Sequence, residues 1–566
     1  MSLYSPESAP PRRSLLLQDS LLIGIMAVLA ACGLVYEYLL SSFAGRILGA
    51  VESAIFAMIG LMIVSMGLGA FAARLFRGPF TAFAWLEAII ALLGVSCILV
   101  ISALIAFTEL LPIIVARTFG MPPDLVPSGG MLAAMQAAAH YSSYLFGFLI
   151  GFLVGMEIPL IARVRERVYG EHLEHNAGTI YGADYLGAGA GAAAWVLWML
   201  TLPPEQAAVI TAVVNVAAGI VFLVVYWQRI DGRIALAVMH LVLLVMAFVI
   251  FTFGRDWTRQ MTDILYRDQV IFSHDTRFQH LTVTERYIQG EPVYGFYLNG
   301  RLQFSSSDEH IYHGMLVYPP MLLTPPGARV LVIGGGDGLA VRDTLDFEPA
   351  AVTLIDLDAD LVQFFTEGDN SDYAAALLAL NEYALGDDRV EVVTADAFIE
   401  VNRLLAEEQR FDAIIVDLPD PSHPDLDRLY SDHFYARLYQ LLTTDGVMSV
   451  QATSPYHARE AFLTVAETLK LAGFPHVEPY RQNVPSFGEW GWVLASKQLA
   501  PPRERLAAAE LDHPWLTSAL LQAAFEFPRD FFLDPPPPNR LGEQRVYDLH
   551  REAWQRDLGI YVEKRR

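Results

Sequence analysis

Residues 330–338 read VLVIGGGDG, an apolar stretch of strand type that runs straight into a glycine-rich turn with one carboxylate, Asp337. Glycines at such a strand-to-helix turn let the backbone approach a nucleoside closely. Asp356 follows the next apolar stretch, about 20 residues on, where a carboxylate can accept ribose hydroxyls. We therefore predict a nucleoside site around a glycine loop that consists of Gly334, Gly335, Gly336 and Gly338.

From Ala328 onward, apolar stretches of strand type alternate with helical ones. The five stretches are 330–333, 351–355, 390–394, 413–416 and 447–452. This alternation indicates a parallel, doubly wound sheet, so residues 328–500 are predicted to form a Rossmann-like α/β domain of the methyltransferase type. Ligands of such sheets bind outside the carboxyl ends of the strands, where Asp337, Asp356, Asp396 and Asp417 all fall.

Three further segments flank this domain. Residues 278–327 are predicted to form a small β subdomain, because 278–286 alternates in polarity and Asn299-Gly300 is typical of a tight hairpin turn. Residues 255–277 are expected to be a linker or connecting helix. The tail, 501–566, is expected to wrap irregularly over the domain.

The N-terminal part is apolar enough to lie in lipid. Hydrophobic residues make up 54% of the 566, and the mean hydropathy is +0.36, which is too apolar for a soluble chain of this length. Residues 1–254 are predicted to be an all-α membrane bundle of about seven spans in the cell membrane. The predicted spans are 20–43, 53–73, 82–107, 132–161, 179–202, 206–227 and 234–253.

Arginines give this bundle a direction. If the bundle has seven spans, nine arginines fall on one side of the membrane, namely Arg12, Arg13, Arg74, Arg77, Arg163, Arg165, Arg167, Arg229 and Arg233. Only Arg46 and Arg117 lie in loops on the other side, so the N-terminus should be cytoplasmic and the C-terminal domain outside. A nucleoside substrate is cytosolic, however. We therefore favour a cytoplasmic C-terminal domain and a miscounted span, with 110–115 as a re-entrant segment or an extra crossing.

Charge and composition narrow the class of ligand. A net charge of −24 argues against nucleic acid and favours a cationic ligand. Cys32 and Cys97 both lie in apolar stretches, and no histidine or cysteine cluster has metal-ligand spacing, so no disulfide, metal or other cofactor is expected. Four acids lie within the spans and either cap spans, pair with nearby arginines or guide a polyamine: Glu37, Glu87, Glu157 and Asp184.

The acidic strand ends suggest a particular chemistry. Asp396 with the backbone of Ala397 suits the amino edge of adenine, which leaves Asp337, Asp417 and Asp420 near the reactive end of the ligand. Such a cluster repels a substrate carboxylate and attracts ammonium groups, as decarboxylated S-adenosylmethionine would require. An acceptor amine is protonated at neutral pH and needs a base before it can attack, and Asp417 fits that role.

Residues 275–498 resemble the spermidine synthase family of polyamine aminopropyltransferases, especially its membrane-fused bacterial branch. The matching stretches are 278–279, 308–313, 334–338, Asp356, 396–397 and 417–421. The resemblance implies transfer of an aminopropyl group to a diamine such as putrescine, giving spermidine and methylthioadenosine, and it implies a homodimer. The implied roles are Asp417 as proton acceptor, His313, Asp337 and Asp420 around the amine, and Gln279, Asp356, Asp396, Ala397 and Pro424 around the thioadenosine.

Some features leave the assignment open. Tyr312 either lines the pocket or only packs beside it, and Gly314 and Phe487 replace a glutamate and a tyrosine that are usual in the family. Glu489 offers a new carboxylate near Phe487, so the acceptor amine is undetermined. Two alternatives remain: a methyltransferase that uses S-adenosylmethionine, against which Asp337 argues, and a polyamine transporter whose soluble domain senses nucleoside or amine.

Overall fold

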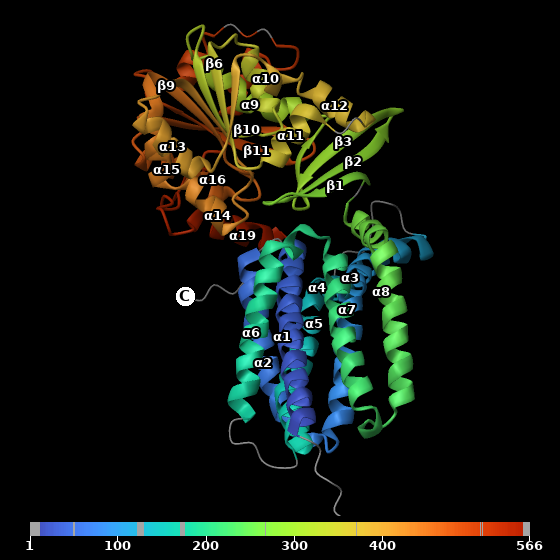
Figure 1. Cartoon of the computed structure of the whole chain (residues 1–566). Helices are drawn as coiled ribbons and strands as arrows, with labels where there is room; N and C mark the ends of the chain where they lie inside the picture. Colours follow the sequence, from blue (N-terminus) through green and yellow to red (C-terminus); the bar gives the residue numbers. More distant parts are fainter. Residues whose placement is uncertain are drawn as a thin grey trace, which may run out of the picture. The chain divides into compact units, whose positions relative to one another are not determined.

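The structure is a computed structural model that describes residues 12–48, 51–120, 130–169, 176–266, 268–368, 371–509, 511 and 513–557. The chain divides into two compact units, Met1–Arg267 and Asp268–Arg566 (Figure 1). The first unit is helical and the second is built on two sheets. Each unit is described by itself.

Seven long helices form the described part of the first unit. They are α1 (Arg12–Leu48), α2 (Val51–Ala72), α3 (Pro79–Thr118), α5 (Ser142–Tyr169), α6 (Asn176–Leu197), α7 (Pro204–Val225) and α8 (Arg233–Thr262), with a short α4 (Met131–His140) before α5. Six of the seven long helices, all except α6, contain a segment long and apolar enough to cross a membrane. By length and composition the described residues thus give six candidate spans, where seven were expected. Residues 110–115 continue α3, so the expectation of a re-entrant segment or separate crossing there is wrong.

The seven helices alternate in direction along the chain (Figure 1). At one end of the bundle, Arg165 near the end of α5 bonds Asp19 near the start of α1 and Asn176 at the start of α6. Tyr38 and Trp195, further along α1 and α6, have ring centroids 6.3 Å apart, so these two helices are parallel. The α6 helix therefore runs the length of the bundle like its neighbours, although its glycine-rich sequence makes it less apolar.

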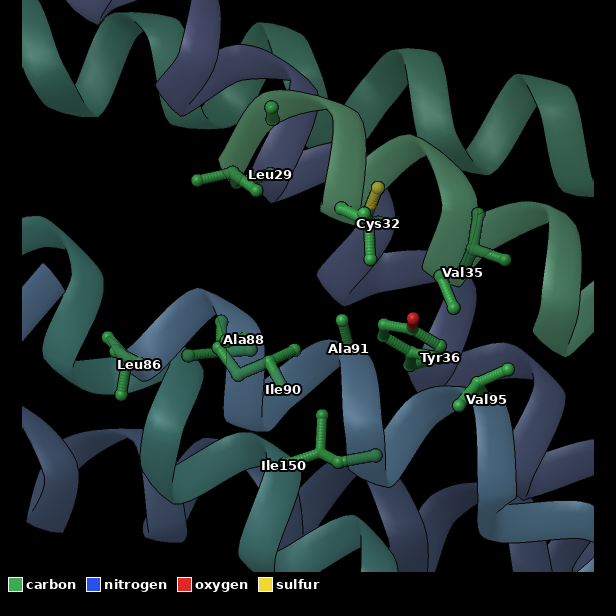
Figure 2. Close-up of a cluster of buried hydrophobic side chains, with 14 of the residues drawn as sticks. Leu29, Cys32, Val35, Tyr36, Leu86, Ala88, Ile90, Ala91, Val95 and Ile150 are labelled. Atoms are coloured by element: carbon green, nitrogen blue, oxygen red, sulfur yellow. The ribbon is translucent and has the colours of Figure 1, made fainter. Parts of the chain in front are cut away.

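Small residues allow the helices to approach closely. A Cβ added at Gly187 of α6 would lie 2.0 Å from the carbonyl oxygen of Ala27, and one at Gly155 of α5 would lie 2.0 Å from that of Met66. Such contacts are typical of helices packed in lipid, where small residues bring backbones together. Figure 2 shows the Tyr36 ring beside Ala91 in the interior of the same bundle.

Two of the acids predicted within the spans are fully inside the bundle. Glu87 and Glu157 are each 1% exposed, and Glu87 Oε2 accepts a hydrogen bond of 2.8 Å from Asn215 Nδ2. Glu157 lies within electrostatic range of both Glu87 and Asp184, and Glu37 and Asp184 are partly buried. Glu87 and Glu157 therefore give the bundle a polar interior, and its use for amines stays a prediction.

In the second unit, a four-stranded antiparallel sheet comes first, in the order β1 (Gln269–Asp275), β2 (His280–Ile288), β3 (Glu291–Leu298) and β4 (Arg301–Ser305). Asn299 and Gly300 connect β3 to β4 with φ angles of 51° and 78°. Both central residues of the turn have positive φ, which is the geometry that matches the twist of a hairpin.

A seven-stranded sheet follows, in the order β10-β11-β9-β8-β5-β6-β7. Its strands are β5 (Arg329–Gly334), β6 (Ala351–Asp356), β7 (Val390–Thr394), β8 (Phe411–Asp417), β9 (Leu442–Gln451), β10 (His476–Val484) and β11 (Gly488–Ser496). The pairs among β5 to β9 are parallel, and the sequence predicted these five strands but not β10 and β11. The chain reverses its winding between β5 and β8, which is where such sheets bind ligands.

Helices cover both faces of this sheet (Figure 1). They are α9 (Glu309–Met321), α10 (Leu339–Leu345), α11 (Ala359–Glu367), α12 (Asp372–Leu380), α13 (Ala397–Ala406), α14 (Pro424–Asp427), α15 (Asp432–Leu441) and α16 (Arg459–Leu471). Val330 and Val332 pack in one core, with α9 to α12, and Leu331 and Ile333 pack in the other, with α13, α15 and α16. Burial on both faces explains why the strand is continuously apolar.

The tail is more ordered than predicted. It contains α17 (Pro502–Leu506), α18 (Ser518–Ala524) and α19 (Arg545–Asp557), so the expectation of an irregular wrap is wrong for these segments. Val546, His550 and Ala553 of α19 are buried, at positions i, i+4 and i+7. This spacing places them on one face of a helix, which packs against the core shared by α13, α15 and α16.

Candidate active site

The glycine loop lies against the end of β8. Gly334 pairs with Asp417 in the parallel register, and both Gly334 and Gly335 have positive φ, 78° and 70°. A Cβ at Gly334 would lie 2.2 Å from the carbonyl oxygen of Asp417, so no other residue fits without moving β8. The loop and the carboxylate predicted from separate stretches of sequence are thus brought together.

Helix α9 contributes two consecutive side chains that reach this carboxylate. The Tyr312 hydroxyl donates a hydrogen bond of 2.8 Å to Asp417 Oδ1, and His313 Nε2 lies 3.9 Å from Asp417 Oδ2. Both side chains are buried, at 7% and 2% exposed. The sequence does not decide whether Tyr312 lines the pocket or packs beside it; in the structure its hydroxyl is bonded directly to Asp417.

Charged groups hold His313 on its Nδ1 side, opposite the nitrogen that faces Asp417. His313 Nδ1 lies 2.9 Å from Glu309 Oε2, and both oxygens of Glu309 accept from Arg342 Nη atoms, at 2.9 and 3.1 Å. Arg342 also donates to Asp343 and to the carbonyl oxygen of Leu380. The sequence predicts no role for Arg342 or Asp343, because no local pattern indicates that Arg342 contacts Glu309, which lies 33 positions earlier.

These neighbours alter the acid–base properties of the site. Burial lowers the pKa of His313, but its hydrogen bond to Glu309 and the charges of Glu309, Asp337 and Asp417 raise it to about 9. Burial raises the pKa of Asp417 to about 6, with His313 opposing and Asp337 adding to the increase. Burial also raises the pKa of Asp337. At neutral pH a protonated His313 therefore lies beside an ionised Asp417.

Asp356 and Gln279 are held by a second set of bonds. Asp356 Oδ2 accepts from Gly336 N at 3.1 Å, and its Oδ1 accepts from Asp358 N at 2.9 Å, so this carboxylate ties β6 to the glycine loop. Burial raises the pKa of Asp356 to about 6. Gln279 Nε2 donates to Asp358 Oδ2 at 2.8 Å, which brings the small sheet to the same edge.

Asp396, Ala397 and Pro424 lie further along that edge. Asp396 caps α13, whose first residue is the buried Ala397, by accepting from Phe398 N, and its Oδ2 accepts from Arg428 Nη2 at 2.8 Å. Pro424 is the first residue of α14, which leads directly into Arg428. The predicted adenine contact at Asp396 is therefore already paired with an arginine that the sequence did not reveal.

Asp420 has one occupied and one free oxygen. Its Oδ2 lies 3.1 Å from Nε2 of His550 in α19, whereas its Oδ1 is buried and has no hydrogen-bond partner among the described residues. His550 was not predicted, since it lies 130 residues further along the chain. No local sequence signal identifies it, because its contact with Asp420 depends on how α19 packs.

Aromatic side chains form a wall behind Tyr312. The ring centroids of Phe487, Trp490 and Trp492 lie 5.9, 6.4 and 5.6 Å from that of Tyr312. Glu489, which was expected to offer a new carboxylate, forms an ion pair with Arg481 through its Oε1. Within the described ranges, no group of three or more histidine, cysteine, aspartate or glutamate side chains could hold a metal ion.

A doubly wound sheet with a glycine loop, an acid at the end of the second strand and a buried acidic group beside the loop is typical of proteins that bind a nucleoside-linked ligand. Comparisons with known proteins narrow this class. The chain is 51% identical to the polyamine aminopropyltransferase of Shewanella oneidensis over 99% of both chains, and 33% identical to polyamine aminopropyltransferase 1 of Streptomyces coelicolor over 94% of both. The chain belongs to the polyamine aminopropyltransferase family.

Two further comparisons concern the second unit. Residues 309–505 match the spermine/spermidine synthase domain. Among solved structures, a spermidine synthase in complex with the transition-state analogue AdoDATO is similar, with 26% identity and a TM-score of 0.40 over 46% of this chain and 85% of that one. The spermidine synthase of Thermotoga maritima is similar with 26% identity and a TM-score of 0.38.

Proposed function

We propose that this protein transfers the aminopropyl group of decarboxylated S-adenosylmethionine to a diamine, putrescine, giving spermidine and methylthioadenosine. The observation that carries the proposal is the buried Asp417 beside the glycine loop, flanked by Tyr312 and His313. We assign it the role of the base. His313, Asp337 and Asp420 are proposed to hold the amine and aminopropyl groups, and Gln279, Asp356, Asp396, Ala397 and Pro424 the thioadenosine.

In this mechanism the acceptor ammonium first loses one proton to Asp417 Oδ2, while Oδ1 stays bonded to Tyr312. The amine lone pair then attacks the aminopropyl methylene carbon that is bonded to the sulfonium sulfur. The carbon–sulfur bond breaks, and sulfur keeps the electron pair as a neutral thioether. The product carries a secondary ammonium, so one proton is released in each turnover. The sulfonium is already a good leaving group, and the residues mainly orient the partners and remove the proton.

Asp337 is proposed to exclude the carboxylated donor. It lies on the glycine loop next to the β8 end, where the carboxylate of ordinary S-adenosylmethionine would meet the charges of Asp337 and Asp417. Like charges in a buried site repel strongly. This argues against the methyltransferase alternative, as does membership of the aminopropyltransferase family.

Product analysis tests the proposal. We expect the detergent-purified full chain, given decarboxylated S-adenosylmethionine and a panel of diamines, to release methylthioadenosine and an aminopropylated amine, with putrescine the best acceptor. Ordinary S-adenosylmethionine, supplied in parallel, should give no methylated product. Nucleoside binding without turnover for any diamine would instead favour the sensing or transport alternative.

The first unit is proposed to anchor the protein in the cell membrane as a multi-pass bundle. Its seven alternating helices place the start of α1 and the end of α8 at opposite ends, and the start of α1 lies at the arginine-rich end with Arg165. We infer that the N-terminus and the catalytic unit lie on opposite sides of the membrane. A cytoplasmic catalytic unit, which a cytosolic donor favours, then requires the arginine-rich end to face outward, against the usual bias.

Paired reporter fusions test this topology. Green fluorescent protein and alkaline phosphatase, each fused in turn to the N-terminus and to the C-terminus, should report unlike compartments for the two ends. The compartment reported by the C-terminal fusion also identifies the side of the membrane from which the catalytic unit receives its aminopropyl donor. Like readouts at both ends would mean that one helix, with α6 the first candidate, does not cross.

A further inference from the structure

Helix α19 lies outside the matched domain, residues 309–505, yet it contributes a side chain to a residue proposed to bind the amine. His550 is 1% exposed, and its Nε2 lies 3.1 Å from Asp420 Oδ2. A buried charge needs a partner, and His550 supplies one to Asp420 from far along the chain. The C-terminal tail therefore takes part in the geometry of the site.

Several bonds fix α19 in this position. Asn539, just before the helix, donates from Nδ2 to Asp427 Oδ2 at 2.9 Å, and Tyr547 N donates to Asp427 Oδ1 at 3.0 Å. Val546 and Ala553 pack into the core beneath. The contact between His550 and Asp420 is thus set by a docked helix and not by a free tail.

The contacts of His550 limit what Asp420 can do. Trp554 Nε1 donates to His550 Nε2 at 2.9 Å when that nitrogen is unprotonated, and His457 stacks on the Trp554 ring with centroids 5.4 Å apart. One ring nitrogen cannot donate to Asp420 and accept from the indole at once. When Nε2 carries the proton, it donates to Asp420 Oδ2 and the indole N–H of Trp554 loses this acceptor. The buried Oδ1, which has no partner in the described part of the chain, is then left to accept from a ligand.

We propose that His550 is a positioning residue for the acceptor amine: it holds one oxygen of Asp420 so that the other accepts a hydrogen bond from the ammonium group of the substrate. This inference rests on the proposed function, since it assigns Asp420 to the acceptor. The acceptor is an alkyl diamine or polyamine, because Oδ1 is acceptor-only and sits in a buried site rich in carboxylates. Recognition of this aminopropyltransferase's acceptor would then depend on a helix that the matched domain does not include.

Steady-state kinetics of the full chain test the inference. Replacement of His550 by alanine should raise the KM for the acceptor about tenfold, as for loss of one charge-assisted hydrogen bond, while kcat and the KM for the nucleoside donor stay near the wild-type values. His550→Gln keeps an N–H donor near the position of Nε2 and should restore most of the acceptor affinity. Arg551→Ala, on the exposed face of the same helix, serves as the matched control and should change neither constant.

The outcomes separate the two proposals. If the wild-type protein transfers no aminopropyl group, the proposed function fails whatever the variants do. If the wild type is active and His550→Ala has an unchanged or lower acceptor KM, or if His550→Gln is as impaired as His550→Ala, the positioning role is overturned. Binding of methylthioadenosine by each variant shows that the second unit is folded.

Discussion

Replacing Asp417 by asparagine should lower kcat for aminopropyl transfer by about 10²–10⁴-fold, the usual contribution of a general base. The amide cannot take the proton of the acceptor ammonium, but it is isosteric and can still accept from Tyr312 through its oxygen. Binding of methylthioadenosine should therefore persist, because the nucleoside contacts proposed at Asp356 and Gln279 are untouched. Single-turnover release of methylthioadenosine measures the loss, and near-normal turnover would rule out Asp417 as the base.

The pH dependence gives an independent readout of the same role. A base must be ionised, and the pKa of Asp417 is raised to about 6 by burial, so kcat/KM for the wild type should fall about tenfold per pH unit below 6. Asp417→Asn should lose this limb. Asp425→Asn, which changes an exposed carboxylate on the same segment, should keep both the rate and the limb.

Local patterns predicted the parts of the fold that short-range physics decides. The apolar run 330–333 indicated a strand buried on both faces, and Val330 and Leu331 do pack in different cores. In contrast, β10 carries Pro479, Arg481 and Asn483 and so lacks the apolar run of a central strand. It was missed because it lies at the edge of the sheet, where polar side chains are tolerated.

The candidate site also contains features that the sequence predicts and features that it does not. Carboxylates at strand ends could be predicted, because parallel strands bring their carboxyl ends to one edge, as Gly334 and Asp417 show. The groups that hold these carboxylates could not be predicted. His550 meets Asp420 across 130 positions, and Arg428 meets Asp396 across 32, so only the packing of α19 and α14 brings them together.

Arg342 gives the second large expected effect. Replacing Arg342 by methionine should destabilise the α9–α10 region by about 3–5 kcal/mol, since removing one partner of a buried ion pair leaves an uncompensated charge. Glu309 is 4% exposed and accepts two bonds from Arg342, which with His313 hold the pKa of Glu309 at about 2 against the effect of burial. Hydrogen exchange of the full chain, read on peptides from α9 and α10, measures the loss.

A second substitution separates lost attraction from buried charge. In the Arg342→Met background, Glu309→Gln removes the uncompensated carboxylate and should recover part of the stability, but His313 would lose its anionic partner, so activity should stay low. Arg389→Met breaks an exposed pair with Asp387 and should cost less than about 1 kcal/mol. A loss for Arg342→Met as small as that of Arg389→Met would show that Glu309 is stabilised by other groups, and His313 would then not depend on Arg342 for its charge or its position.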